Sequence, residues 1–185
     1  MITRDSSFYI FLLFSISLFS IIMAQENKNH DKAFFAAGCF WGVESTFQDL
    51  NGVVSTTVGY SGGKVKNPSY ELVCTGITGH AEAVEVVYDS KIVSYKQLLD
   101  AFFTLHDPTT LNRQGPDVGT QYRSAIFYNN AEEKKLAEET ITEINESGKF
   151  PNKIVTEVES ASNFYSAEEY HQDYYKKRGL TGCAI

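Results

Sequence analysis

Cys39 is the residue of this 185-residue chain whose setting most strongly suggests chemistry. It lies in Gly38-Cys39-Phe40-Trp41-Gly42, where a short apolar run typical of a buried strand gives way to a helical pattern. A thiol at a helix N-terminus meets free backbone N–H groups and the positive end of the helix dipole, so we expect its pKa to fall. Phe40 and Trp41 are suited to wall an apolar pocket beside the sulfur. On position alone, a structural cysteine among core aromatic residues remains an alternative.

Glu82 is the second candidate because it lies near the start of a run with strand-like alternation, His80 to Tyr88, and the residues that follow it are largely apolar. A carboxyl that is partly desolvated in such a strand has a raised pKa, in the range of a general acid. The alternative is an ordinary solvated glutamate at the end of a strand.

Three histidines, His80, His106 and His171, raise the question of a Cys–His hydrolase, in which a histidine base activates the thiol. None of them lies in a recognisable hydrolase signature, so we expect structural hydrogen bonds from them. The Gly59–Lys64 segment (GYSGGK) lacks the spacing of a phosphate-binding loop and is interpreted as a turn.

The chain has three cysteines, which is too few for a disulfide scaffold and leaves at least one thiol outside any intramolecular bridge. Cys39, Cys74 and Cys183 also lack the paired ligand spacing of a zinc site. We expect Cys74, inside a short predicted helix, to be buried and inert. Cys183 lies in the glycine-containing tail 179–185, which we expect to be flexible.

Strand-like and helical patterns mix along the chain and must position these residues. The predicted strands are 33–37, 53–60, 80–88, 124–128 and 154–158; the predicted helices are 41–50, a short one ending at 73, 95–105, one ended by Gly148, and a final one ending near Lys177. This order indicates an α+β fold, a two-layer α/β sandwich around a mixed or antiparallel sheet with a ferredoxin-like (split βαβ) core.

Helix starts carry capping patterns at three places along this order. Ser94 with Gln97 forms a capping-box pattern before the helix 95–105, and Asn130 with Glu133 does so for the next helix. Ser166 with Glu169 predicts the start of the final, tyrosine-rich helix.

Several long motifs in this order resemble the methionine sulfoxide reductase A family, the peptide-methionine (S)-S-oxide reductases. The motifs are GCFWG at 38–42, TVGYSGG at 57–63, NPSYELVCTGITGHAEAVEV at 67–86, FFTLHDPTTLNRQGPDVGTQYRSAIFY at 102–128 and FYSAEEYHQDYY at 164–175. The resemblance runs from about Ala33 to the C-terminus, and it implies a two-layer α/β sandwich.

The resemblance also implies a reaction and a set of roles. The Cys39 thiolate attacks the sulfoxide sulfur while Glu82 gives a proton to the oxygen. Tyr70 and Tyr122 donate hydrogen bonds to that oxygen, and Asp117 helps to hold the polar network of the site. Methionine then leaves, and the attacking cysteine becomes a sulfenic acid.

Substrate binding and recycling follow from the same resemblance. Phe40 and Trp41 hold the methyl group of the substrate, methionine-S-sulfoxide in peptides or free. Cys183 condenses with the sulfenic acid to a disulfide, which a thioredoxin-like partner reduces. No metal or organic cofactor is implied. Two other functions stay open: a Cys–His thiol hydrolase and a non-enzymatic extracytoplasmic domain that binds peptides.

The composition, 43% hydrophobic and 21% charged, is that of an ordinary globular protein and excludes a disordered or collagen-like chain. The formal net charge of −7 argues against a nucleic-acid-binding protein, which needs a basic surface. We expect a monomer with one catalytic domain, residues 32–185, after a polar lead-in at 25–31.

The first 24 residues contain an uncharged apolar run from Phe8 to Ala24. It is typical of a secretory signal peptide cleaved after Ala24, with an uncleaved membrane anchor as the alternative. We therefore expect an exported protein, either periplasmic or secreted. It would be anchored to a membrane only if the leader is not cleaved. An exported enzyme of this chemistry meets an oxidising compartment, which predicts a dedicated extracytoplasmic reductant.

Overall fold

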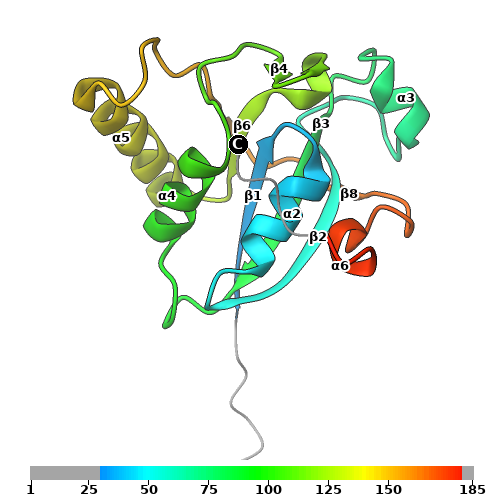
Figure 1. Ribbon diagram of the computed structural model, residues 1–185, viewed down its shortest axis with the longest axis horizontal. Coiled ribbons are helices and arrows are strands. Elements are labelled where there is room, and N and C mark those ends of the chain that lie inside the picture. The colour runs from blue at the N-terminus through cyan, green and yellow to red at the C-terminus, as the bar shows by residue number, and fades with distance from the viewer. Residues whose placement is uncertain (1–29, 181–185) are drawn as a thin grey trace, which may run out of the picture.

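Six strands form one mixed sheet in residues 30–180, the part of the chain that the computed structural model describes (Figure 1). They are β1 (Asp31–Ala37), β2 (Val53–Ser61), β3 (Ala81–Tyr88), β6 (Ser124–Tyr128), β7 (Glu157–Ser160) and β8 (Tyr165–Ser166). The strand order is β7-β6-β1-β3-β2-β8, and every neighbouring pair is antiparallel except β6 and β7, which are parallel. The predicted α+β fold with a mixed sheet is confirmed.

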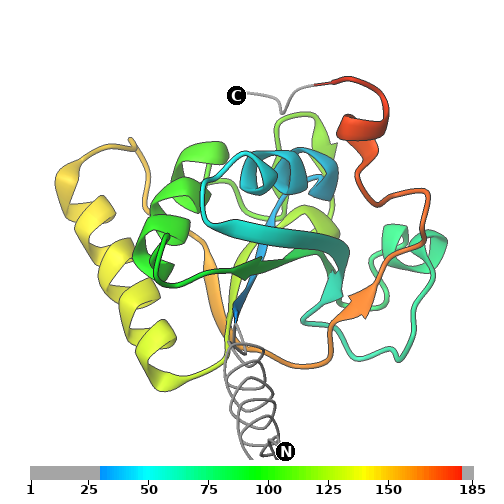
Figure 2. The same ribbon diagram turned by 90° about the horizontal axis from the view of Figure 1, so that it is seen from below.

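One face of the sheet is covered by helices, as Figure 2 shows. They are α2 (Phe40–Gln48), α4 (Tyr95–Leu105) and α5 (Ala131–Ser147). The main core lies in this layer, where Phe47 of α2 and Phe102 of α4 both stack on Phe35 of β1. Burial of these large aromatic surfaces is the main free energy that holds the helices to the sheet.

Alternation along β1 gives the sheet its second apolar face. Phe35 and Ala37 point into the helical layer, while Phe34 and Ala36 belong to a smaller cluster on the opposite face. There Phe34 contacts the ring of Phe164, at a centroid distance of 5.5 Å, from the chain between β7 and β8. β1 is therefore a central strand that is apolar on both faces.

Two of the predicted helix caps are confirmed. Ser94 and Gln97 form a full capping box at the start of α4. The Asn130 side chain accepts from the N–H groups of the first turn of α5, and Gly148 ends that helix in the left-handed conformation.

The final helix differs from the prediction. Helix α6 covers only Tyr174–Lys177; Ser166 ends the short strand β8, and the residues between β8 and α6 form irregular chain and turns. The reason is that Gln172 uses its side chain to bond the backbone of Val58 in β2, at 2.9 Å for both N–H and C=O. Asp173 then adopts the left-handed conformation, with φ of 52°, which a continuous helix does not permit.

Several short elements were not predicted, and one strand was placed too early. The last strand predicted at 154–158 is observed at Glu157–Ser160 as β7. The hairpin of β4 (Arg113–Gln114) and β5 (Asp117–Val118), the 3₁₀ turn η1 (Thr120–Tyr122) and β8 were missed. The short helix that was predicted to end at Val73 is α3 (Tyr70–Cys74).

Some predictions concern residues outside the described range. The proposed leader 1–24, nearly all of the lead-in 25–31 and Cys183 of the tail 179–185 fall there; Asp31, placed in the lead-in, is the first residue of β1. Within residues 30–180, no helix has both the length and the apolarity to span a membrane.

Candidate active site

Cys39 lies at the junction between the central strand β1 and helix α2. Gly38 has a φ of +89°, which favours glycine and turns the chain from the strand into the helix. Cys39 is the N-cap of α2, and it borders a cleft of about 440 Å³. Trp41 and Asp117 line the same cleft, together with apolar walls from Leu105 and other residues. The predicted strand-to-helix position of the thiol is confirmed.

The pKa of Cys39 moves in the direction opposite to the prediction. The backbone N–H groups of Trp41 and Gly42 in the first turn of α2 do lower the thiol pKa, as expected for a helix N-terminus, although the Cys39 side chain accepts no capping hydrogen bond. Burial outweighs them, and the carboxylates of Glu82 and Asp117 add to it, so the pKa of Cys39 is raised to about 12. The thiol of the free protein is therefore protonated at neutral pH, and its deprotonation must be coupled to its surroundings.

Glu82 lies on β3, with 2% of its surface exposed. Its Oε2 accepts a hydrogen bond of 3.0 Å from the backbone N–H of Phe40, the residue after Cys39. Burial raises the pKa of Glu82 to about 7, and the nearby Asp117 charge adds to the effect. The expected desolvated carboxyl is observed, and it is anchored to the first turn of the helix that carries the thiol.

Tyr70, Tyr122 and Asp117 come from three separate short elements and surround this pair. Ser69 caps α3 and so fixes Tyr70 as its first residue, while η1 carries Tyr122 and β5 carries Asp117. The charge of Glu82 raises the pKa of both tyrosines, after the larger effect of burial, and that of Tyr122 reaches about 12. Both phenols therefore stay protonated and can donate hydrogen bonds.

Phe40 and Trp41 lie in an aromatic cluster whose centre is His171, a residue not predicted for the site. Phe40 is buried and Trp41 is half-buried. The indole Nε1–H of Trp41 donates to Nδ1 of His171 at 3.1 Å, so the imidazole proton resides on Nε2. That buried Nε2 has no hydrogen-bond partner among the described residues. Tyr70 also packs on this imidazole, with a centroid distance of 4.4 Å.

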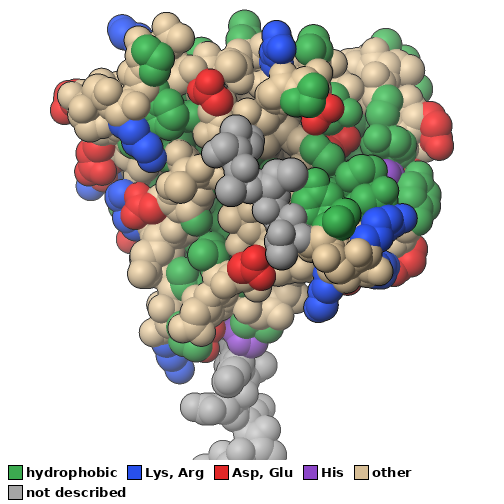
Figure 3. Space-filling model, viewed as in Figure 1, with side chains coloured by type: hydrophobic (Ala, Val, Ile, Leu, Met, Phe, Trp, Pro, Cys, Tyr) green, Lys and Arg blue, Asp and Glu red, His purple; other side chains and the backbone are tan. Residues whose placement is uncertain are grey.

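Tyr174 of α6 completes the cluster by stacking on the indole of Trp41, at 3.6 Å between centroids and 3° between planes. The guanidinium of Arg178 lies 3.6 Å over the other face of Tyr174. Figure 3 shows hydrophobic side chains gathered on this face of the molecule, beside α6. His171 and Tyr174 both lie in the FYSAEEYHQDYY motif, which was the available signal for them.

The other two histidines make the structural hydrogen bonds that were expected. His80 accepts from the Gly63 N–H at 3.0 Å and bonds the Val65 carbonyl at 2.8 Å. His106 bonds the Phe102 carbonyl and the Ser124 hydroxyl, at 2.8 and 2.7 Å. Among the described groups that shift the pKa of the Cys39 thiol there is no histidine.

Cys74 is exposed, and the prediction that it is buried was wrong. It is the last residue of α3, one turn after Tyr70, and a five-residue helix at the surface does not cover its own C-terminal side chains. Its thiol is close enough to the Tyr70 hydroxyl to help raise the pKa of that phenol, after the larger effect of burial. Cys74 thus lies at the rim of the site rather than in the core.

Known proteins resemble the chain over nearly all of the described part. The family model for peptide methionine sulfoxide reductase matches residues 31–185. The peptide methionine sulfoxide reductase MsrA of Methanothermobacter thermautotrophicus is 58% identical over 158 residues, covering 85% of this chain and 94% of that protein.

Two solved structures of yeast Mxr1 are similar in fold. Reduced Mxr1 from Saccharomyces cerevisiae has a TM-score of 0.79 and 39% identity, covering 86% of this chain and 91% of that one. Mxr1 in its complex with Trx2 has a TM-score of 0.58 and 30% identity, covering 80% and 87%.

Proposed function

Because this chain belongs to the peptide methionine sulfoxide reductase family, of the MsrA type, we propose that Cys39 and Glu82 carry out its reaction, the reduction of methionine-S-sulfoxide to methionine. The observation that carries the proposal is the pairing of a half-buried thiol with a buried carboxyl across the first turn of α2. A pKa near neutrality makes this carboxyl a proton donor at the pH where cells work.

Glu82 starts the reaction in its protonated form. It gives its proton to the sulfoxide oxygen, which makes the sulfur electrophilic. Without its charge, the thiolate of Cys39 is also less disfavoured, because that charge is one of the causes of the raised thiol pKa. The thiol proton can then replace the one that Glu82 has given away.

The oxygen transfer balances without a further reactant. The Cys39 thiolate adds to the activated sulfoxide sulfur, and the oxygen then passes from that sulfur to the cysteine sulfur. A bond between the cysteine sulfur and the oxygen forms, the S–S bond of the adduct and the sulfoxide S–O bond break, and an electron pair stays on the methionine sulfur. Two electrons have left the cysteine sulfur, which is now a sulfenic acid. The neutral phenols of Tyr70 and Tyr122 donate hydrogen bonds to the oxygen as charge builds on it, and Asp117 orders this network.

The substrate methyl group fits the aromatic wall of Phe40 and Trp41. Phe40 contacts Trp41 and the imidazole of His171, at centroid distances of 6.4 and 5.1 Å. A sulfur-bound methyl group gains dispersion and sulfur–aromatic contact from such rings. The aromatic wall therefore contacts the apolar side of the substrate, while the Glu82 carboxyl hydrogen-bonds to the sulfoxide oxygen.

A Cys39→Ser variant tests the assignment. It is expected to lose turnover of a methionine-S-sulfoxide peptide, because a serine hydroxyl cannot form the sulfenic acid. The assay follows methionine release on separated S and R epimers with a thioredoxin system. Full activity of the variant on the S epimer would overturn the proposal.

Recycling by Cys183 and a thioredoxin-like reductant is proposed for this chain as well. The solved complex of yeast Mxr1 with Trx2 supports such a partner. Cys183 attacks the sulfur of the sulfenic acid, water leaves, and the resulting disulfide is reduced by thiol exchange. Cys183 follows Gly182 and lies outside the described residues.

A Cys183→Ser variant separates recycling from chemistry. We expect it to release about one methionine per enzyme and then stop with thioredoxin as the reductant. Rapid quench with one and with excess equivalents of substrate measures this. Normal cycling would instead assign recycling to Cys74 or to direct reduction of the sulfenic acid.

The leader and the domain boundaries also remain proposals. The apolar run Phe8–Ala24 supports export, with a catalytic domain from residue 32 onward that acts as a monomer on oxidised proteins. N-terminal sequencing of the protein from its native membrane and soluble fractions tests whether the leader is cleaved. A start near Gln25 supports cleavage, and an intact N-terminus in the membrane fraction supports the anchor.

A split βαβ core is the finer proposal for the fold. The order β6-β1-β3-β2, with antiparallel neighbours and helices α2 and α4 in the two crossovers, supports it. β7 and β8 are then additions at the two edges of this core. Amide hydrogen exchange tests this division. Exchange that is slowest in the four central strands would support it, and exchange that is slowest in the edge strands β7 and β8 would count against it.

A further inference from the structure

One face of α2 carries Trp41, Glu44 and Gln48, at positions i, i+3 and i+7. The segment from Glu168 to Leu180 runs along this face. It supplies the two groups that hold the Trp41 indole, His171 by a hydrogen bond of 3.1 Å and Tyr174 by a stack at 3.6 Å. The orientation of Trp41 therefore depends on where this segment lies.

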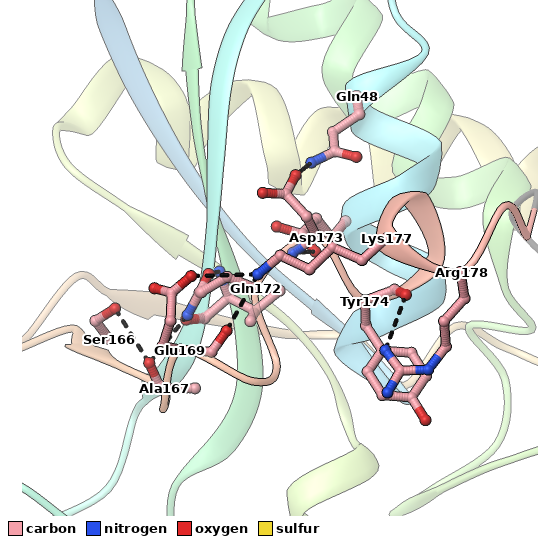
Figure 4. Close-up of polar contacts among 11 residues, drawn as sticks. Gln48, Ser166, Ala167, Glu169, Gln172, Asp173, Tyr174, Lys177 and Arg178 are labelled. Carbon is pink, nitrogen blue, oxygen red and sulfur yellow. Dashed lines mark hydrogen bonds and ion pairs between the residues drawn. The ribbon is translucent and has the colours of Figure 1, made fainter.

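Asp173 lies between those two residues in the sequence, and both its backbone and its side chain hydrogen-bond to α2. Its backbone N–H donates to Oε2 of Glu44 at 2.9 Å, and its carboxylate accepts from Nε2 of Gln48 at 2.8 Å. Figure 4 shows the second of these contacts. Thr56 of β2 closes the network, donating to Glu44 at 3.2 Å and accepting from Gln48 at 2.9 Å. We name Glu44, Gln48 and Asp173 the α2–173 clamp.

Local structure alone does not place Asp173. Its φ of 52° is unfavourable for a non-glycine residue, and α6 has four residues, too few to be stable alone. Glu44 is 2% exposed, and burying its carboxyl costs free energy that an apolar side chain at this position would not cost. The clamp therefore fixes one geometry of this segment at a cost in the free energy of folding.

We propose that Glu44 and Gln48 are positioning residues for substrate binding, which act by fixing Asp173 and thereby hold His171 and Tyr174 against Trp41. This rests on the proposed function, in which Trp41 binds the substrate methyl group. The clamp does not touch the reacting atoms, so its loss weakens the hold on the substrate while Cys39 and Glu82 keep their own contact through Phe40.

The test compares Glu44→Ala, Gln48→Ala and the conservative Glu44→Gln. Gln48→Ala guards against a folding failure of Glu44→Ala, because Gln48 is only half-buried and alanine favours the helix. Glu44→Gln keeps an oxygen that accepts from the Asp173 N–H. Glu169→Gln is the matched control: it removes a carboxylate from the same segment, one that bonds Lys177 at the surface at 3.2 Å and not α2.

Two readouts separate positioning from general stabilisation. KM for a methionine-S-sulfoxide peptide should rise about tenfold in both alanine variants, with the single-turnover rate at saturating substrate within about twofold of wild type. The emission of Trp41, the single tryptophan of the chain, should change in the same variants. Glu44→Gln and Glu169→Gln should resemble wild type in both.

The inference is overturned if both alanine variants keep the wild-type KM and emission, or if the control changes them equally. A fall in melting temperature without either change identifies a purely structural role and also overturns it. The emission readout needs no turnover. A wild-type protein without reductase activity would therefore refute the proposed function while the clamp could still be judged from the emission.

Discussion

At the scale of single residues, the charge of Glu82 influences the state of the Cys39 thiol. The two groups lie across the first turn of α2, and both have pKa values raised chiefly by burial. An ionised Glu82 disfavours the thiolate, and a protonated Glu82 does not. The pair is therefore suited to hold the thiol neutral until a substrate oxygen receives the proton.

A Glu82→Gln variant should separate these two effects of the carboxyl. Turnover should fall by about 10²-fold or more, since the proton donor is lost. Alkylation of Cys39 by iodoacetamide at neutral pH should become faster, because removal of the negative charge lowers the thiol pKa.

Glu85→Gln is the control for this variant, three residues along the same strand. Glu85 bonds Lys32 at 2.9 Å on the surface and is not among the charges that shift the thiol. Its turnover and its alkylation rate should both equal those of wild type. Slower or unchanged alkylation in Glu82→Gln would contradict the coupling.

Cys39 and Glu82 could be found from the sequence because each has a local signal, a helix start and an apolar strand. The direction in which the thiol pKa shifts could not be found from the sequence, because it depends on how much of the fold covers the sulfur. His171 was likewise missed as a site residue: its bond to Trp41 joins residues 130 apart, and only the path of the segment after β8 brings them together.

At the scale of elements, the two glycines around Cys39 have different structural reasons. Gly38 has a φ of +89°, and a Cβ there would lie 2.7 Å from the Cβ of Gln114. Gly42 lies within α2, where a Cβ would meet nothing within 4 Å. Only Gly38 is required by the backbone conformation. Gly42 lines the cleft, where the absence of a side chain leaves more space.

The pair Gly38→Ala and Gly42→Ala should change stability in opposite directions. Gly38→Ala should lower the free energy of unfolding by at least about 1–2 kcal/mol, from its positive φ and the contact with Gln114. Gly42→Ala should raise it by up to about 1 kcal/mol, the helix propensity difference. Urea unfolding measures both, and equal losses would refute this reading of the turn.

Local sequence signals predicted the regular elements well. The capping box of Ser94 and the left-handed Gly148 were visible because they involve residues three or four apart, or one residue alone. The final helix was predicted too long because the side chains of Glu168 and Gln172 bond other elements. Glu168 accepts from the Tyr60 hydroxyl at 2.8 Å, and Gln172 bonds the backbone of β2. Such distant partners leave no periodic pattern.

At the scale of the whole molecule, the buried carboxyls of Glu44 and Glu82 and the buried imidazole of His106 contribute to the dependence of stability on pH. The pKa values of Glu44 and Glu82 are raised to about 7, in each case mainly by burial. Burial lowers the pKa of His106 to about 4. The carboxyls favour the folded state at low pH and the imidazole favours it at high pH, so the contributions oppose each other.

The carboxyl contribution can be isolated with Glu82→Gln, because His106 is present in both proteins and cancels in their difference. An unfolded glutamate ionises near pH 4.5, whereas folded Glu82 ionises near 7. The stability of wild type relative to the variant should therefore be greatest below pH 4.5 and fall by up to about 3 kcal/mol as the pH rises to 7. Urea unfolding of both proteins across this range measures the difference, and Glu44→Gln should show the same sign for the same reason. A difference that stays flat, or rises with pH, would show that folded Glu82 ionises at or below the pH where the unfolded glutamate does, so that it is ionised at neutral pH and cannot act there as the proton donor.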